Sequence, residues 1–219
     1  MEISYNRDKY LSEFSIKTLT DRYMIEGEKS PQDAFARAAK AFSDDDAHAQ
    51  RLYDYASKLW FMFSTPVLTN GGTDRGMPIS CFLNHVEDSR RGITSHYTEN
   101  AFLSSVGGGI GGHWSKVRGV GSSTSNGSES TGVIPFLKVV DGEMLAFSQG
   151  ITRRGSYAAY LDISHPEVEE FLDVRKPTGG DVNRKSVNLH HGVLIDDRFM
   201  EIIEQATRVE GVDDSWDLI

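Results

Sequence analysis

The sequence has a single cysteine, Cys81, among its 219 residues. No disulfide can therefore form within the chain, and chemistry that needs two thiols must take the second from elsewhere. Long hydrophobic runs are also missing, and the longest apolar stretch, near LWFMF, is too short to span a membrane. The first residues, MEISYNRDKY, lack the basic and then apolar plan of a signal peptide. We therefore expect a cytoplasmic protein with no membrane partner.

Positive charge is scarce. The net charge of −9 argues against a broad nucleic-acid-binding face, because such a face needs a basic stripe. A site for one phosphate cluster stays open, since a few local Arg or Lys residues suffice. Hydrophobic residues make up 38% of the chain and charged residues 25%, which is typical of a globular protein with a core. The length fits one domain, or a small domain with part of a second, and no internal repeat is visible.

The chain reads as helical up to about residue 65. Ser30 is predicted as an N-cap, with Pro31 at the first helical position and Asp33 as the reciprocal acid of a capping box. The segment SDDDAHAQRLYDYASKLWFMF predicts a second helix with an acidic start. Its apolar face is expected to consist of Leu52, Tyr55, Leu59 and Phe63.

After residue 65 the pattern changes. Short apolar pieces, ISCFL, YAAYLDI and LHHGVLI, alternate with glycine-rich loops and short helices such as HPEVEEFLDVRK. Strands that alternate with helices predict parallel βα units and hence an α/β fold. The segment GSSTSNGSESTG, residues 121–132, has the composition of a flexible linker, although its hydroxyls and amides could also hold an anion.

Seven glycines crowd into SSVGGGIGGHWSKVRGVGS, residues 104–122. Three of them satisfy G-x-G-x-x-G, but a dinucleotide-binding loop needs a strand directly before the motif and a helix directly after it. Here a predicted helix precedes the motif, and further glycines interrupt the segment that follows. Two interpretations remain: a tight helix-to-loop connection, or bare backbone that approaches a ligand closely.

A metal site is not expected. His190 and His191 are neighbours on a predicted strand, so their side chains point to opposite faces and make a poor chelating pair. No cysteine or carboxylate lies at ligand spacing from them. We expect both histidines to be structural.

Two longer stretches flank the glycines, STPVLTNGGTDRGMPISCFLNHVEDS and FSQGITRRGSYAAYLDISHPEVEEFL. The order Thr-Pro, Ser-Cys, Asp-Ser, glycine-rich segment, Gln-Gly…Arg-Arg-Gly resembles the catalytic subunit of the aerobic, class I ribonucleotide reductases from about residue 14 onward. The resemblance implies a helical region over 1–65, followed over 66–219 by the first part of a ten-stranded α/β barrel. It also implies reduction of ribonucleoside diphosphates to deoxyribonucleoside diphosphates for DNA synthesis.

The resemblance makes Cys81 the first of two reductant thiols, on the first barrel strand beneath the substrate ribose. A dithiol that becomes a disulfide supplies the two electrons that removal of the 2′-hydroxyl requires. The alternative for a lone cysteine between Ile79 and Phe82 is a small buried hydrophobe. The positions that match the family's substrate contacts are Thr65, Ser80, Gly108 and Gly109.

A second nucleotide site is implied, in which a nucleoside triphosphate at a subunit interface selects the base to be reduced. Arg118 matches the cation that meets the effector phosphates, and a planar guanidinium suits phosphate oxygens. Residues 119–132 and 148–156 match the two specificity loops. The first part of the site matches Asp88, Ser89 and Arg90, and the residues that read the effector match Gln149 with Arg154 or, instead, Arg153. The alternative for Asp88 and Arg118 is ordinary surface charge.

The family's catalytic chain is far longer. The finger-loop cysteine, the Asn and Glu acid/base pair, the second reductant cysteine, the tyrosine relay, the C-terminal thiols and the ATP-cone have no match here. We therefore expect an N-terminal piece, from a split gene, an interrupted gene or a truncated sequence, that is inactive alone.

Several partners follow from the resemblance. They are the C-terminal catalytic portion, a small subunit with a tyrosyl or di-metal radical, thioredoxin or glutaredoxin, a second copy of the subunit, and a dNTP or ATP effector with Mg²⁺. A fragment of a cobalamin-dependent reductase and a non-catalytic nucleotide-binding remnant remain as alternatives.

Overall fold

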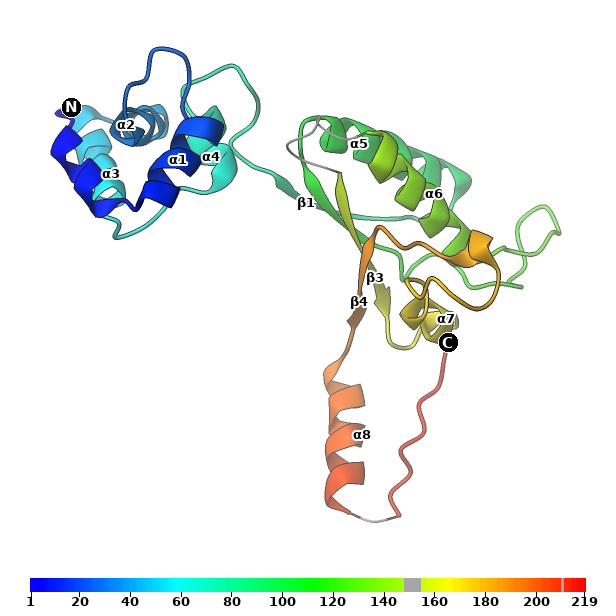
Figure 1. Ribbon diagram of the computed structural model, residues 1–219. Helices are drawn as coiled ribbons and strands as arrows, with labels where there is room; N and C mark the ends of the chain where they lie inside the picture. The colour runs from blue at the N-terminus through cyan, green and yellow to red at the C-terminus, as the bar shows by residue number, and fades with distance from the viewer. Residues whose placement is uncertain (148–154, 210) are drawn as a thin grey trace. The chain divides into compact units, whose positions relative to one another are not determined.

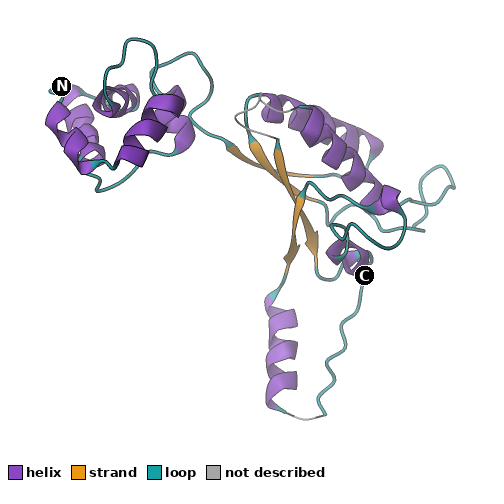
Figure 2. Cartoon of the chain, in the orientation of Figure 1, coloured by secondary structure: helices purple, strands orange, loops and turns teal. Residues whose placement is uncertain are grey.

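The computed structural model describes residues 1–147, 155–209 and 211–219. The chain divides into two compact units, Met1–Ser80 and Cys81–Ile219 (Figure 1). The first unit is helical, and in the second unit helices accompany a sheet (Figure 2).

The first unit is organised around helix α2. Its elements are η1 (Tyr5–Tyr10), α1 (Glu13–Arg22), α2 (Pro31–Ala41), α3 (Asp46–Ser57) and α4 (Thr65–Asn70). Helix α2 contacts each of the other four elements. Its inward residues are mostly alanines around Phe35, and small side chains let neighbouring helices approach closely. Tyr53 of α3 and Leu68 of α4 complete this core, so α4, which starts at residue 65, belongs to the first unit.

The predicted start of α2 is confirmed. The Ser30 side chain accepts a hydrogen bond from the Gln32 N–H at 3.1 Å, and Asp33 accepts one from the Ser30 N–H, also at 3.1 Å. This reciprocal arrangement is the capping box, and Pro31 occupies the first turn.

The predicted apolar face of α3 is partly wrong. The helix ends at Ser57, and the Trp60 N–H donates to the Tyr55 carbonyl at 3.0 Å, which closes the helix end. Leu59 lies beyond this turn, with a φ of 62°, and both it and Tyr55 are exposed. The buried face is instead formed by Ala49, Tyr53 and Ala56. Leu52 and Phe63, the other two predicted residues, are partly buried and pack against this core. The prediction was therefore wrong only at Tyr55 and at Leu59, which lies past the true helix end.

The second unit is a parallel α/β structure, as predicted. Its four strands lie in the order β1 (Cys81–His85), β2 (Gly109–His113), β3 (Ser156–Asp162) and β4 (His190–Leu194), and all neighbouring pairs are parallel. The connections contain α5 (Arg90–Ser105), α6 (Ile134–Ala146), α7 (Val168–Leu172) and η2 (Val182–Arg184), and α8 (Asp197–Arg208) follows β4.

Helices α5 and α6 lie side by side against one face of the sheet (Figure 1). The core between them and the sheet contains Ile110, Tyr157 and Leu161, which are all buried. The other face differs sharply: Leu83, which alternates with the inward residues of β1, is 85% exposed. The sheet therefore has one packed face and one accessible face in the described part of the chain.

The glycine-rich segment contains a strand, which neither interpretation of its composition anticipated. On the accessible face, a Cβ at Gly111 would lie 2.6 Å from the Leu83 side chain and 3.3 Å from the Tyr160 ring. On the packed face, a Cβ at Gly112 would overlap the Tyr157 hydroxyl. Glycine disfavours a strand interior but permits close approach of neighbours. The glycines of β2 thus make room for large side chains on both faces.

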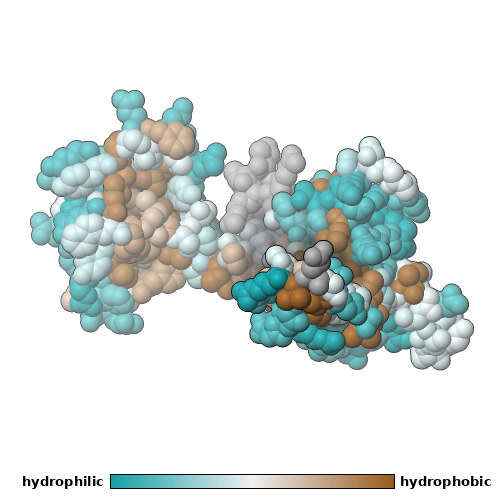
Figure 3. Space-filling model, turned by 90° about the horizontal axis from the view of Figure 1, so that it is seen from below, coloured by the Kyte–Doolittle hydropathy of each residue, from teal (hydrophilic) through white to brown (hydrophobic). Residues whose placement is uncertain are grey.

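The last helix is amphipathic. Phe199, Ile202, Ile203 and Ala206 of α8 follow helical spacing, and Figure 3 shows brown apolar surface beside teal polar surface where α8 points toward the viewer. The Trp216 ring packs edge-on against Phe199 with 5.1 Å between ring centroids. Within the described ranges, no helix combines the length and the apolar character needed to cross a membrane.

Candidate functional site

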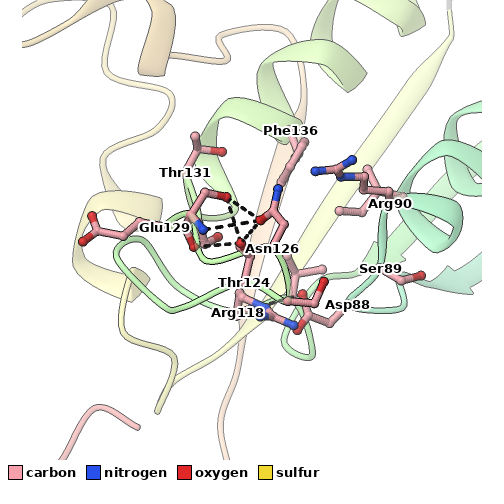
Figure 4. Close-up of a pocket in the computed structure, with 14 residues that line it drawn as sticks. Asp88, Ser89, Arg90, Arg118, Thr124, Asn126, Glu129, Thr131 and Phe136 are labelled. Atoms are coloured by element: carbon pink, nitrogen blue, oxygen red, sulfur yellow. Dashed lines mark hydrogen bonds and ion pairs between the residues drawn. The ribbon is translucent and has the colours of Figure 1, made fainter.

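A cleft of about 610 Å³ lies where β1 and β2 end (Figure 4). Ligands in open α/β sheets bind beyond the carboxyl ends of the strands, which is where this cleft lies. The start of α5, the segment after β2 and the loop 124–131 line it. Its lining includes all four residues predicted to bind the effector, Asp88, Ser89, Arg90 and Arg118.

Arg118 is held in place by two partners. Its Nε donates to Asp88 Oδ2 at 2.7 Å, and its Nη1 donates to the Ser123 carbonyl at 2.5 Å. The Arg118 N–H also approaches Asp88 Oδ1 at 3.4 Å. Both side chains are about one-third exposed, so the ion pair itself adds little stability. Its effect is to fix the direction of the guanidinium at the cleft.

The start of α5 adds a positive end to the cleft. Ser89 is the N-cap, and its side chain accepts from the Gly92 N–H at 2.9 Å. Arg90 follows at the first helical position and also lines the cleft. A helix N-terminus carries partial positive charge and favours anions. The carboxylates of Asp88 and Glu129 balance the two arginines, which leaves the helix end as the excess positive element.

The interpretation of residues 121–132 as a flexible linker is wrong. The Gly121 N–H donates to the Ser130 carbonyl at 2.9 Å, and the Ser130 N–H donates to the Ser122 carbonyl at 2.8 Å. The Thr124 N–H donates to the Ser128 carbonyl at 2.8 Å, across a turn in which Gly127 has a φ of 79°. Small polar residues here form a closed loop, and their hydroxyls line the cleft.

Sequence reasoning missed two parts of this lining. Phe136 reaches the cleft from α6, and Glu129 comes from the far strand of the loop. Phe136 follows a proline near a helix start, which carries no sign of a ligand. Glu129 lies in a segment whose composition indicated a linker, so only the folded loop shows where it points.

A second group of predicted residues meets at the opposite end of the strands, where β1 and β2 begin. Cys81 begins β1 and is the register partner of Gly109, which in turn is paired with Ser156. The three residues form a row on the accessible face of the sheet. Cys81 is exposed, which does not fit the alternative of a small buried hydrophobe. The Phe82 ring covers Gly108, because a Cβ at Gly108 would lie 2.8 Å from that ring.

Two further predicted residues, Thr65 and Ser80, belong to the first unit. Thr65 begins α4 in the first unit, where its hydroxyl lies 3.2 Å from the Tyr23 hydroxyl. Ser80 is the last residue of that unit. The predicted reading residues Gln149, Arg153 and Arg154 lie outside the described residues.

Between the packed face and α5 lies a buried polar cluster. His96 Nε2 and Trp114 Nε1 each lie 2.8 Å from the Tyr157 hydroxyl. Burial lowers the pKa of His96 to about 4, so the ring is neutral near pH 7. Burial also raises the pKa of Glu143 on α6 to about 7. None of these residues is among those that line the cleft, and we assign them to the core.

A metal centre has no support in residues 1–147, 155–209 and 211–219. These residues contain no group of three or more His, Cys, Asp or Glu side chains that could hold a metal ion. His190 and His191 are neighbours on β4, and the His191 ring packs edge-on against Phe171 at 5.2 Å.

Family comparisons agree with both units. Residues 9–76 match the family model described as ribonucleotide reductase, all-alpha domain. Residues 79–219 match the model described as ribonucleotide reductase, barrel domain. The chain belongs to the ribonucleotide reductase large-subunit family.

Individual relatives extend this result. The chain is 44% identical over 217 residues to the ribonucleoside-diphosphate reductase large subunit of Invertebrate iridescent virus 6, covering 99% of this chain and 22% of the relative. It is 35% identical to the alpha subunit of Helicobacter pylori strain J99, covering 94% and 27%. The Actinobacillus ureae class Id ribonucleotide reductase alpha subunit aligns with a TM-score of 0.75 and 28% identity, covering 93% and 36%. The chain thus spans about a quarter of the length of these curated relatives.

Proposed function

We propose that the chain forms the part of a ribonucleoside-diphosphate reductase that carries one reductant thiol and the pocket for a nucleoside triphosphate effector. The observation that carries this proposal is the row formed by Cys81 and Gly109. An exposed thiol lies beside bare backbone on the accessible face of a parallel sheet. The relatives named ribonucleoside-diphosphate reductases support the reaction.

The thiol suits the chemistry of 2′-hydroxyl removal. The C2′–O bond breaks and a C2′–H bond forms, while the hydroxyl leaves as water. Two thiols supply the two protons and two electrons, one hydrogen ending on C2′ and the other in the water, as the sulfurs join in a disulfide. Cys81 supplies one thiol, and a polypeptide outside this sequence supplies the other. Gly109 presents no side chain on the same face, so a ribose can lie against its backbone beside the sulfur. Ribonucleoside diphosphates are the proposed substrates.

The cleft suits a triphosphate. Arg90, Arg118 and the start of α5 provide the positive side, and the hydroxyls of the 124–131 loop provide hydrogen-bond donors. Mg²⁺ that accompanies a nucleotide is commonly held by its phosphates and waters, and we propose the same here. Residues 148–156, including Gln149, Arg153 and Arg154, are proposed to carry the effector signal to the substrate.

The same function requires partners. We propose a second copy of the subunit, a radical-generating small subunit, a dithiol reductant such as thioredoxin or glutaredoxin, and the remaining part of the catalytic barrel. Helices α5 and α6 carry exposed apolar side chains that a second copy would cover. They are Phe102, which is 73% exposed, Val139 and Leu145.

Calorimetric titration of dTTP into the 219-residue chain tests the effector pocket. We expect one saturable site, with affinity reduced at least about tenfold in Arg90→Ala. Lys40→Ala is the matched control, because it removes an exposed cation of α2 that lies in the other unit. Absence of binding, or equal loss in both variants, would contradict an effector site at this cleft.

Reconstitution tests the reaction. The chain is combined with a polypeptide that supplies the remaining three-quarters of the relatives, a radical-bearing small subunit, a dithiol and a ribonucleoside diphosphate. We expect turnover only in the complete mixture. Binding of dTTP without turnover in any such mixture would favour a non-catalytic nucleotide-binding protein.

A further inference from the structure

Three consecutive residues after β3, His165, Pro166 and Glu167, contact both ends of the loop that walls the cleft. We propose that this turn, which we call the mount, fixes both ends of the loop and so keeps the effector pocket in shape. His165 and Glu167 are then positioning residues for the bound triphosphate. The inference rests on the proposed function for the identity of the ligand. The contacts themselves do not depend on it.

His165 holds the entry to the loop. Its side chain is buried, with 5% exposure, and its Nε2 lies 2.8 Å from the Val117 carbonyl. Its Nδ1 accepts from the Glu167 N–H at 3.1 Å. Because Nδ1 accepts, the ring proton sits on Nε2 and is donated to Val117. Val117 directly precedes Arg118, so this hydrogen bond fixes the backbone from which the guanidinium reaches the cleft.

Glu167 holds the exit. Its side chain is 4% exposed, and Oε2 accepts from the Val133 N–H at 2.7 Å. Val133 is the N-cap of α6 and has no side-chain cap of its own, so Glu167 caps this helix from another element. A Cβ at Gly132 would overlap the carboxylate, and the φ of Gly132 is 81°. The exit therefore needs both a glycine and this acid.

Two further contacts complete the mount. The Pro166 ring lies 3.1 Å from where a Cβ at Gly119 would be, so proline and glycine backbone pack closely between the two hydrogen bonds. Arg184 Nη2 lies 3.4 Å from Glu167 Oε1, and Arg184 also binds Glu170 through Nε at 2.5 Å. The buried charge of Glu167 is thus partly compensated on the side away from the loop.

The consequence concerns the entropy of binding. Residues 118–132 leave and return to the same three-residue turn, so the ends of the loop are fixed before any ligand arrives. A wall that is already ordered does not have to be ordered by the ligand, which improves affinity without a new contact. Loss of the mount should weaken triphosphate binding although neither His165 nor Glu167 lines the cleft.

The test compares Glu167→Ala with a matched control, Asp141→Ala. Asp141 is also a buried carboxylate, 3% exposed, but it accepts from the N–H groups of Asn188 and Leu189 at 2.9 Å, which precede β4 and lie outside the loop 118–132. Amide hydrogen exchange of residues 118–132 is measured on the free chain, and dTTP affinity is measured by calorimetry. Thermal unfolding is recorded for both variants.

We expect similar losses of thermal stability in the two variants. Only Glu167→Ala should speed exchange within 118–132 and weaken dTTP binding at least about tenfold. Glu167→Gln keeps an acceptor for the Val133 N–H, so it should fold and lose only about two- to fivefold. Unchanged exchange and affinity in both Glu167 variants, or equal effects of Asp141→Ala, would overturn the mount. A wild-type chain that binds no dTTP would contradict the effector assignment alone, and the exchange data would still decide the mount.

Discussion

Cys81 on β1 is the register partner of Gly109 on β2, at the end of the sheet where both strands begin. Asp88 and Arg118 meet beyond the opposite end, where the same two strands finish. A five-residue parallel strand measures about 13 Å between its first and last Cα atoms, at 3.3 Å per residue. The thiol and the cleft are therefore separate sites on one sheet, and substitutions can address each without touching the other.

Cys81→Ser should abolish dithiol-supported turnover in the reconstituted complex, because a hydroxyl cannot form the disulfide that releases two electrons. Binding of dTTP should stay within about twofold of the wild-type value, since the cleft lies at the opposite end of the strands. Turnover is followed by product formation and binding by calorimetry. Normal turnover of the serine variant would show that Cys81 has no redox role. The 219-residue chain alone should not turn over, because it contains one thiol.

Gly112→Ala should destabilise the second unit. The added methyl would overlap the Tyr157 hydroxyl and lie 3.1 Å from the His96 ring, inside a buried hydrogen-bonded cluster. Overpacking of this kind costs roughly 1–3 kcal/mol, or a decrease in Tm of about 2–12 °C for a chain of this size.

Gly142→Ala is the matched control for that substitution. Gly142 lies in α6 with open space around its Cβ position, so alanine should stabilise the helix by up to about 1 kcal/mol. Calorimetric unfolding of both variants checks the pair. A stable Gly112→Ala protein would mean that the bare backbone of β2 is not needed for packing.

The contrast between these two glycines shows how far the sequence alone could lead. The capping box at Ser30 and the parallel strands were predictable, because local side chains and apolar runs specify them. The strand β2 was not, because glycine has little strand propensity. Only contacts with Tyr157 and Tyr160, about 45 residues further along the chain, account for it.

The candidate sites divide in the same way. The residues of the cleft were identified through resemblance, and the structure brings Asp88 and Arg118 together across 30 positions of the chain. Residues 119–132 were matched to a specificity loop through the same resemblance, but the hydrogen-bonded order of residues 121–132 was not predicted, since their composition is that of a linker. Its order depends on a turn after β3 that contacts both of its ends, and no local pattern reports such a contact.

Glu143 should make stability depend on pH. Burial raises its pKa to about 7, above the ordinary value of 4.5, so between these values the folded protein binds more protons than the unfolded chain. Stability from this group is therefore complete below pH 4.5 and is lost as the pH rises toward 7. Glu143→Gln should remove that loss. At pH 8 it should raise the free energy of unfolding by roughly 1–2 kcal/mol, once solvent screening of a half-buried group is included.

Urea denaturation of wild type and Glu143→Gln at pH 4.5 and pH 8 measures this effect. His96 titrates in the opposite sense, because burial lowers its pKa to about 4 and its contribution is lost as the pH falls below 6.5. The difference between the two proteins cancels the His96 contribution, which both share. Equal differences at the two pH values would show that the pKa of Glu143 is the same in the folded and unfolded states.

Arg118→Ala should weaken effector binding by about 1.5–3 kcal/mol, which is roughly tenfold or more in dissociation constant. The substitution removes a cation from the cleft and also leaves the Asp88 carboxylate without the partner that holds it at 2.7 Å. That unpaired carboxylate should repel the phosphates. Part of the affinity should therefore return in Arg118→Ala/Asp88→Asn, and calorimetric titration of dTTP into the single and double variants checks this.

The same variants separate the effector from the substrate. Diphosphate affinity without effector should barely change in Arg118→Ala, since the row of Cys81 and Gly109 lies at the other end of the strands. The coupling between effector and substrate should fall. By reciprocity, each ligand changes the affinity of the other by the same factor, so an effector that favours the coupled state less also changes the diphosphate affinity less. The measurement is diphosphate affinity in the reconstituted complex, with and without saturating dTTP. Equal loss of both ligands in Arg118→Ala would indicate one shared phosphate site. Unchanged dTTP binding would show that Arg118 is an ordinary surface cation paired with Asp88.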